Sequence, residues 1–150
     1  MIQIRNASGQ ILAEGETVEK IIALECSLEG AQFSGMNLKG VDFRDSDLRG
    51  ANFDEADLTN ANFLRAKLDG ASFRKANARG ACFLGTKLIH ANLCGADLSR
   101  ANLFAANLLG ARIAGACMVG TQITVRALLG LLTGADLTEA HIVGSCGGEL

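Results

Sequence analysis

Large apolar side chains recur at every fifth position of this chain, without a break in register, from Cys26 to Val125. Each unit reads small residue, polar residue, large apolar residue and two variable residues, as in Ala51-Asn52-Phe53-Asp54-Glu55. Of the twenty third positions, ten are Leu, six Phe and two Ile, and the others are Met118 and Ala78. The first position is Ala in fourteen units. A period this short predicts identical local units that stack into a solenoid.

A spacing of five fits neither a continuous helix nor a continuous strand. Within one unit, however, the first and third residues are two apart and share one face of an extended segment. The chain must then turn before the next unit to restore the inward orientation. Gly, Asn and Asp tolerate the dihedral angles of such corners, and eleven of the twenty fifth positions are Gly. The pattern therefore predicts a coil with short sides and a corner after every unit.

The type of central residue predicts the number of sides. Phe occupies every tenth position from Phe33 to Phe83, and Leu fills the centres between them from Leu28 to Leu68. Aromatic and aliphatic sides alternate, which requires an even number, and two sides leave too little room for such large centres. We therefore predict four sides and twenty residues per coil, with one Phe column at positions 33, 53 and 73 and another at 43, 63 and 83. Five coils at about 4.8 Å spacing give a tube about 24 Å long.

This A(D/N)LXX periodicity resembles that of the pentapeptide repeat family, over about two-thirds of the chain. The resemblance implies an all-β solenoid, the right-handed quadrilateral β-helix of that family, and the handedness comes from the resemblance alone. The chain departs from the motif at Lys67, Lys87 and Arg112 in the polar second position and at Ala78 in a centre. We expect a local bulge or an underpacked layer there, with the fold unchanged.

Both ends of the repeat region, 26–125, are expected to be covered, because an open solenoid exposes apolar side chains and unpaired backbone groups. Residues 1–25 predict a hairpin and then a short helix capped by Thr17. Residues 126–150 predict a segment, 126–132, that is either a helical turn or an irregular coil, followed by two further units shifted in register by one residue, at 135–137 and 140–142, and a tail. The chain reads as one domain, 1–150.

The composition disfavours several classes of site and location. No apolar run approaches the ~18 residues of a membrane span, and the first residues do not read as a secretory leader, so we expect a cytoplasmic protein without membrane contact. The five Cys lack paired or zinc-like spacing and are read as free thiols. His90 and His141 are read as surface residues and not as a metal pair. No catalytic or cofactor motif is present, and a closed, packed tube is expected to offer no pocket. We therefore predict a non-enzymatic protein with no cofactor.

The best-known activity of the family is DNA mimicry, in which an acidic rod binds DNA gyrase. Mimicry needs a sustained negative surface shaped like duplex DNA. Residues 26–125 carry nine acidic and eleven basic side chains, a net charge of +2. The repeat region therefore lacks the charge that mimicry needs, and a DNA-mimicking modulator of a topoisomerase such as gyrase is the alternative function. Direct nucleic-acid binding is not expected either, because the basic residues are mixed with acids and no exposed aromatics interleave them.

One surface feature departs from an ordinary solvated face. Fourth positions point outward, and on one side of the tube they read Arg44, Leu64, Leu84, Phe104 and Thr124, with Ile89 and Leu109 on the adjoining side. Large apolar groups in neighbouring columns make a contiguous patch. The C-terminal segment, a second copy of the chain or another protein partner are three possible covers. The prediction is a protein-interaction scaffold that self-associates as a homodimer, with the partner-binding residues Leu64, Leu84, Ile89, Phe104 and Leu109.

Overall fold

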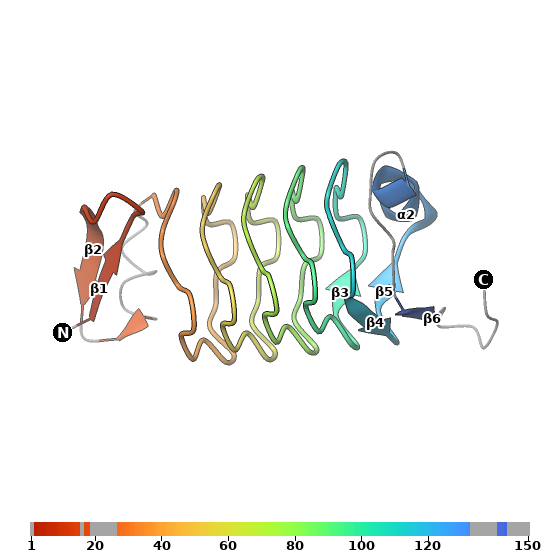
Figure 1. The fold of residues 1–150 in the computed structure, drawn as a ribbon, viewed down its shortest axis with the longest axis horizontal. Coiled ribbons are helices and arrows are strands. Elements are labelled where there is room, and N and C mark those ends of the chain that lie inside the picture. Colours follow the sequence, from red (N-terminus) through yellow and green to blue (C-terminus); the bar gives the residue numbers. More distant parts are fainter. Residues whose placement is uncertain (1, 16, 19–26, 133–140, 144–150) are drawn as a thin grey trace.

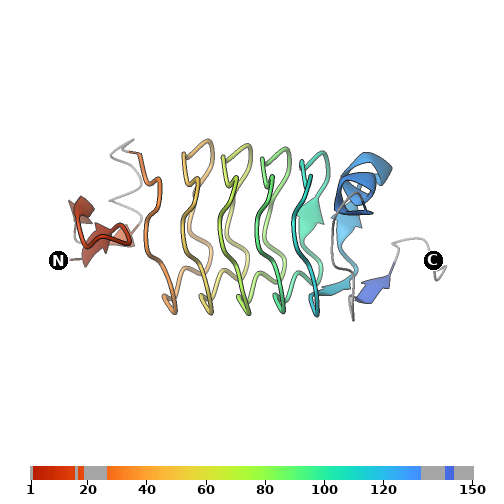
Figure 2. The same cartoon turned by 45° about the horizontal axis from the view of Figure 1, so that its top comes forward.

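The computed structural model describes residues 2–15, 17–18, 27–132 and 141–143. Stacked coils form a tube along the longest axis of the molecule, with residues 2–15 at one end and residues 125–132 at the other (Figure 1). Parallel β-bridges join second-position residues twenty apart, for example Asn52 with Ser72 and Asn62 with Cys82. The predicted coil of twenty residues and four sides is therefore confirmed. The coils stay evenly spaced when the molecule is turned (Figure 2).

The backbone hydrogen bonds of one unit, Ala51 to Glu55, show why the repeat holds its shape. The amide of Ala51 closes the preceding corner by donating to the Leu48 carbonyl at 3.1 Å. The amide of Asn52 donates to the preceding coil at 2.8 Å, and those of Phe53 and Glu55 donate to the following coil at 2.7 and 2.9 Å. Four of the five amides in this unit therefore have backbone acceptors, which is the condition for an ordered buried backbone.

The fifth amide, that of the fourth position, explains the preference for Asn or Asp at the second. The Asp54 amide donates to Oδ1 of Asn52 at 2.9 Å, the local bond that Asn and Asp side chains form two residues on. The same bond joins the pairs Asp42–Arg44, Asp57–Thr59, Asn62–Leu64, Asn92–Cys94, Asp97–Ser99, Asn102–Phe104 and Asn107–Leu109. A carbonyl or carboxylate oxygen at the second position thus completes the hydrogen bonding of the unit.

Every fifth position from 30 to 120 has a positive φ, which closes the corner into the next side. Eleven of these residues are Gly, and eight are not. Asp45 and Asn60 tolerate this region well, whereas Ala105 has a Cβ and no side chain that could form a compensating bond, and its φ is 57°. The prediction that Gly, Asn and Asp serve the corners is thus confirmed only for part of them, because the repeated corner also holds other residues in the left-handed region.

The interior is built on the two predicted Phe columns. Phe43 and Phe63 stack at a centroid distance of 4.9 Å and an interplanar angle of 3°, and Phe53 and Phe73 stack at 4.9 Å and 12°. Rings from different columns meet edge to face, with Phe53 and Phe63 at 5.5 Å and 84°. Both arrangements are favoured for aromatic pairs. The stacking distance equals the separation of hydrogen-bonded strands, so the rings and the backbone share one spacing.

The bulges expected at the departures from the motif are absent. Bridges run without interruption from Asp47 through Lys67 and Lys87 to Asn107, and Arg112 pairs with Asn92. The expectation of a bulge was wrong because second-position side chains point outward, where a long cation fits without moving the backbone. At the small centre, Ala78 is fully buried, and its amide keeps its bond to the next coil at 2.8 Å.

At the N-terminal end, β1 (Ile2–Arg5) and β2 (Ile11–Gly15) pair antiparallel and confirm the predicted hairpin. Asn6 forms an antiparallel bridge with Ala31, which attaches the hairpin to the first coil. The short helix predicted after Thr17 falls largely on 19–26, outside the described residues. Val18 is described and is buried.

At the C-terminal end, β3 (Asn102–Leu103) pairs parallel with β5 (Gln122–Ile123), and β4 (Cys117–Val119) with β6 (His141–Val143). Of the two structures left open for 126–132, the helix is correct: α2 spans Val125–Leu132. Because α2 interrupts the coil, Met118 pairs with Ile142, 24 residues further on. A spacing of 24 is one residue short of a multiple of five, so it agrees with the predicted one-residue shift of the unit at 140–142. The unit at 135–137 and the tail lie outside the described residues.

Candidate functional site

The five predicted partner-binding residues lie in two adjoining columns on the surface of the tube. We call them the apolar face: Leu64, Leu84, Ile89, Phe104 and Leu109. Backbone hydrogen bonds between coils stack the first column: the Arg65 amide donates to the Leu84 carbonyl and the Gly85 amide to the Phe104 carbonyl, each at 3.0 Å. The second column is stacked in the same way, one side further along the coil, by a bond from His90 to the Leu109 carbonyl at 2.9 Å. The structure thus brings the five residues together, and their role in binding stays a prediction.

Exposure within the apolar face increases toward the C-terminal end. Leu64, Leu84 and Ile89 are half-buried, whereas Phe104 is 55% and Leu109 47% exposed. Leu129, in α2, is also 55% exposed. Sequence reasoning missed Leu129 because it left the structure of 126–132 open.

Asparagine oxygens fix the backbone under three residues of the apolar face. The amides of Leu64, Phe104 and Leu109 each donate to the Asn two residues earlier, at 3.1, 3.0 and 3.2 Å. Ile89 has Lys87 in that place, and its amide donates instead to Oδ1 of Asp69, one coil earlier, at 3.1 Å. The side chains of the face therefore project from a backbone that is held by side-chain oxygens as well as by the coil ladder.

Helix α2 lies beside the apolar face without covering it. Thr124 caps the helix, since its Oγ1 accepts the Ala127 amide at 3.3 Å, and Ala127 is buried. A Cβ at Gly130 would lie 3.3 Å from the Leu109 nitrogen, so glycine allows the helix to approach the coil closely. Helix α2, which holds most of the described C-terminal residues, therefore covers the coil next to the face and leaves Phe104 exposed.

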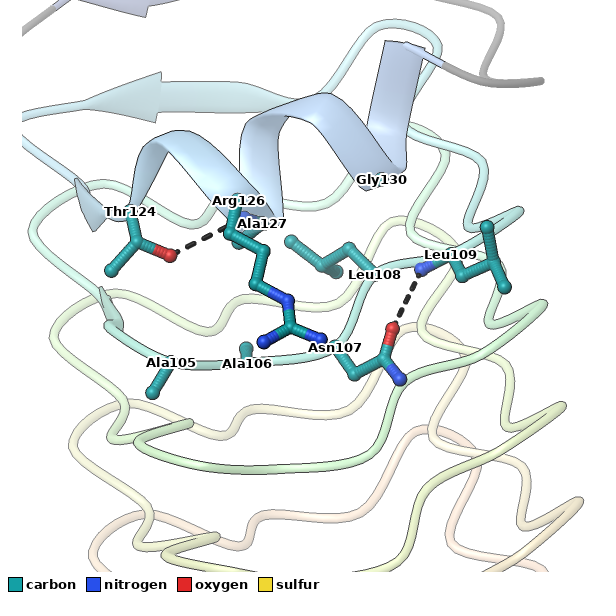
Figure 3. A pocket seen from close by; sticks show the side chains of 9 residues that line it. All are labelled: Ala105, Ala106, Asn107, Leu108, Leu109, Thr124, Arg126, Ala127 and Gly130. Atoms are coloured by element: carbon teal, nitrogen blue, oxygen red, sulfur yellow. Dashed lines mark hydrogen bonds between the residues drawn. The ribbon is translucent and has the colours of Figure 1, made fainter.

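A cavity of about 490 Å³ opens where α2 crosses the last full coil (Figure 3). Its lining residues come from the coil and from α2: Ala105, Ala106, Asn107, Leu108, Leu109, Thr124, Arg126, Ala127 and Gly130. The Arg126 side chain descends from the helix toward the Ala106–Asn107 segment (Figure 3). The expectation that this fold offers no pocket was wrong, because α2 leaves the path of the coil and encloses space against residues 105–109.

The carboxylates of the early coils are mostly paired with cations. Arg65 binds Asp45 at 2.8 Å across one coil, and this hydrogen bond holds the pKa of the Asp45 carboxyl below its usual value. Similar pairs join Arg44–Asp42, Arg49–Asp47, Arg49–Glu29 and Lys39–Asp57. These exposed pairs reduce the negative surface on which DNA mimicry depends.

The charges are nevertheless unevenly distributed along the tube. Residues 27–69 carry eight acidic and five basic side chains, and residues 70–126 carry one acidic and seven basic. The N-terminal half of the tube is therefore negative and the C-terminal half positive. The near-neutral total of the repeat region conceals this asymmetry, which sequence reasoning missed because it treated 26–125 as one block.

Other predicted features of chemistry lie away from the apolar face. Cys82, Cys94 and Cys117 are free and partly exposed, and the thiol of Cys117 lies 3.2 Å from the Ser99 hydroxyl. Within the described ranges, no three His, Cys, Asp or Glu residues are grouped so that they could hold a metal ion. A search of the same residues finds no helix long and apolar enough to cross a membrane.

Comparisons with known proteins agree with this architecture. The model of the family "Pentapeptide repeats (8 copies)" matches residues 26–65, 56–93 and 81–120. A pentapeptide repeat protein from the thylakoid lumen of Arabidopsis thaliana is similar, with 26% identity over 72% of this chain and 62% of that chain, at a TM-score of 0.31. This chain thus spans about three-fifths of the Arabidopsis protein. No curated protein matches the chain.

Two further solved structures are similar. Full-length QnrB1, a plasmid-mediated fluoroquinolone resistance protein, has 22% identity over 83% of this chain and 74% of that chain, at a TM-score of 0.41. HetL from the cyanobacterium Nostoc sp. strain PCC 7120, involved in the regulation of heterocyst differentiation, has 22% identity over 80% and 79%, at a TM-score of 0.28. With its repeats matched over most of their length by the family model, the chain belongs to the pentapeptide repeat family.

Proposed function

We propose that this protein is a non-enzymatic interaction scaffold that self-associates through the apolar face. The observation that carries the proposal is the exposure of Phe104 and Leu109, which are 55% and 47% exposed next to the half-buried Leu84. Full burial of one such side chain stabilises by about 1.5–3 kcal/mol. Neighbouring apolar groups on a flat, regular side give a monomer no benefit, whereas a second copy gains from burying them.

The charge distribution favours an antiparallel arrangement of the two copies. A two-fold axis near Leu84 would bring the column of one copy against the same column of the other, running in the opposite direction. Such a dimer places the negative half, 27–69, of each copy beside the positive half, 70–126, of the other. A parallel arrangement would instead oppose like charges, which costs free energy at an interface.

Size-exclusion chromatography with light scattering tests this proposal on Leu84→Arg. The substitution places a charge at the centre of the column, and in a two-fold dimer it sets like charges against each other across the axis. We expect a dimer for the parent and a folded monomer for the variant. The matched control is Val119→Arg, because Val119 is 47% exposed on another side of the tube, and this variant is expected to remain dimeric.

A monomeric parent at concentrations up to about 1 mM would refute self-association. If Leu84→Arg and Val119→Arg are equally monomeric, the added charge itself separates the copies, whatever its position, and the apolar face is not the interface. If Leu84→Arg unfolds a monomeric parent, the face is covered within one chain.

DNA mimicry directed at gyrase, the alternative, has less support because the acidic residues of the early coils are paired with Arg and Lys. A supercoiling assay with purified gyrase tests it directly, and inhibition by the Leu84→Arg monomer would favour mimicry over the scaffold function. The absence of direct nucleic-acid and membrane binding and the cytoplasmic location stay predictions.

A further inference from the structure

Among the described residues, the lining of the cavity under α2 contains one cation and no carboxylate, over a floor of alkyl groups. We propose that it binds a small organic monocarboxylate with a short apolar chain. The guanidinium of Arg126 would hold the carboxylate, and the methyl and isobutyl groups along the coil would contact the chain. The cavity shares Leu109 with the apolar face, but the group that would hold the ligand, Arg126, lies outside that face, so the two proposals can be tested separately.

The polar part of the argument begins with Arg126. Its side chain is exposed and hangs over the Ala106–Asn107 segment (Figure 3). Arg44, Arg49, Arg65 and Arg79 each form an ion pair with an Asp. Among residues 2–15, 17–18, 27–132 and 141–143, no such pair is found for Arg126. A guanidinium is a planar, permanently charged donor that matches a carboxylate in bidentate geometry, so its free donors define the class of ligand.

The other described polar side chains at the rim, Asn107 and Thr124, carry no negative charge. Oδ1 of Asn107 already accepts the Leu109 amide at 3.2 Å, and Oγ1 of Thr124 already accepts the Ala127 amide at 3.3 Å. Their oxygens are therefore engaged within the protein, which leaves the Asn107 amide hydrogens and the Thr124 hydroxyl hydrogen as the groups that can still donate. A lining of donors around one cation favours an anion and disfavours a cationic or strongly basic ligand.

The floor determines the rest of the ligand. The exposed Ala105 and Leu109 contribute a methyl and an isobutyl group, and the buried Ala106, Leu108 and Ala127 close the floor beneath them. Ligand pockets of ~300–1,000 Å³ with an apolar lining and a few placed polar groups are typical of small-molecule sites, and this cavity has about 490 Å³. Inorganic anions would use the arginine and leave the alkyl floor uncovered, so an anion with an apolar chain fits better.

Nuclear magnetic resonance titration with hexanoate tests the proposal on the full chain. We expect saturable shifts of the backbone amides of Asn107, Leu109 and Ala127. Arg126→Gln should weaken hexanoate binding by about tenfold, the contribution of one charge-assisted interaction, and Arg126→Lys should retain part of it. The matched control is Arg112→Gln, since Arg112 is exposed on a different side of the tube and has the same charge; its affinity should equal that of the parent.

Two analogues separate the parts of the site. Hexanol keeps the chain without the charge, and acetate keeps the charge without the chain, so each should bind more weakly than hexanoate. Equal binding of acetate and hexanoate, or equal weakening by Arg126→Gln and Arg112→Gln, would overturn the proposal. So would the absence of shifts at the cavity. Repeating the titration on Leu84→Arg keeps this result distinct from the oligomeric state: binding there should match the parent, and its loss would place the site between copies and overturn the single-chain site.

Discussion

Replacing Asp69 with alanine removes the acceptor that the structure gives to the amide of Ile89. The bond spans one coil at 3.1 Å, and it exists because Lys87, in the usual place of Asn or Asp, cannot accept. A hydrogen bond contributes about 0.5–1.5 kcal/mol to stability, and more when one partner is charged. Since Ile89 is half-buried, water replaces part of the lost bond, and we expect Asp69→Ala to lower the free energy of unfolding by about 1 kcal/mol.

The same reasoning predicts a rescue. Asparagine at position 87 would stand two residues before Ile89, as Asn107 stands before Leu109 with a bond of 3.2 Å. The double variant Asp69→Ala with Lys87→Asn should therefore regain most of the lost stability, while Asp69→Asn should change little because its amide oxygen still accepts. Lys87→Asn alone, in the presence of Asp69, should be nearly neutral.

Urea unfolding followed by circular dichroism gives the free energies for this cycle, and hydrogen exchange of the Ile89 amide reports on the bond itself. Exchange should accelerate in Asp69→Ala and return toward the parent rate in the double variant. If Asp69→Ala and the double variant are equally destabilised, an oxygen at the second position does not stabilise the chain by accepting the amide of the fourth position. A neutral Asp69→Ala with unchanged exchange would show that the bond does not stabilise the coil.

Three other outcomes follow from the structure. Phe63→Ala should cost about 3–5 kcal/mol in urea melts because it leaves a cavity between stacked rings, whereas Arg74→Ala, on the exposed surface, should cost about 0.5 kcal/mol or less. Ala105→Gly should raise the free energy of unfolding by up to about 1 kcal/mol, since Ala105 has a φ of 57° that only glycine adopts without strain, and Gly85→Ala, at φ 65° one coil earlier, should have the opposite sign in thermal melts. Arginine partners hold the pKa values of Asp42, Asp45 and Asp47 below the ordinary value. These pairs therefore stabilise the folded chain above the unfolded pKa of about 3.9 and lose that contribution as the pH falls through the folded pKa. Urea midpoints should fall as the pH drops below about 4, and less so in high salt, and unchanged midpoints would contradict the pairing.

Much of the fold was predictable because one local rule is repeated many times. The alternation of Phe and Leu centres gave the coil length, and the bridges between Asn52 and Ser72 and their equivalents confirm it. The turns required positive φ at the fifth positions, which the frequency of Gly already indicated. Errors at single units, such as the bulge expected at Lys67, arose because the hydrogen bonds of the neighbouring coils hold the backbone of an atypical residue in the regular geometry.

The substitute acceptors were not predicted, although the sequence contains a signal for them. Asp54 accepts the Arg74 amide at 2.9 Å, where Ser72 takes the second position, just as Asp69 accepts that of Ile89. In both cases an Asp at the fourth position precedes, by one coil, a unit that lacks Asn or Asp at the second. Finding this pattern requires comparison of residues twenty apart as well as within a unit.

The cavity and the exposed end of the apolar face could not be predicted in the same way, because both depend on where α2 leaves the coil. Its path rests on the close contact of Gly130 with Leu109 and on the burial of Ala127. These are single packing events without repetition in the sequence, and no periodicity encodes them. The five residues of the face were found because they occupy fourth positions of regular units, and Leu129 was missed because it does not.

Fourth positions are where a repeat of this kind can carry information about function. The first and third residues of each unit fill the interior, the second supplies an acceptor and the fifth closes the corner, so folding constrains four of the five positions. The side chain of the fourth position, by contrast, points outward, and apart from substitute acceptors such as Asp54 and Asp69 the fold requires neither a polar nor an apolar group there. An apolar residue at one such position is uninformative. Leu64, Leu84 and Phe104 lie in consecutive coils, with Ile89 and Leu109 beside them. The stability of the tube does not explain this departure, and the proposed burial against a second copy would.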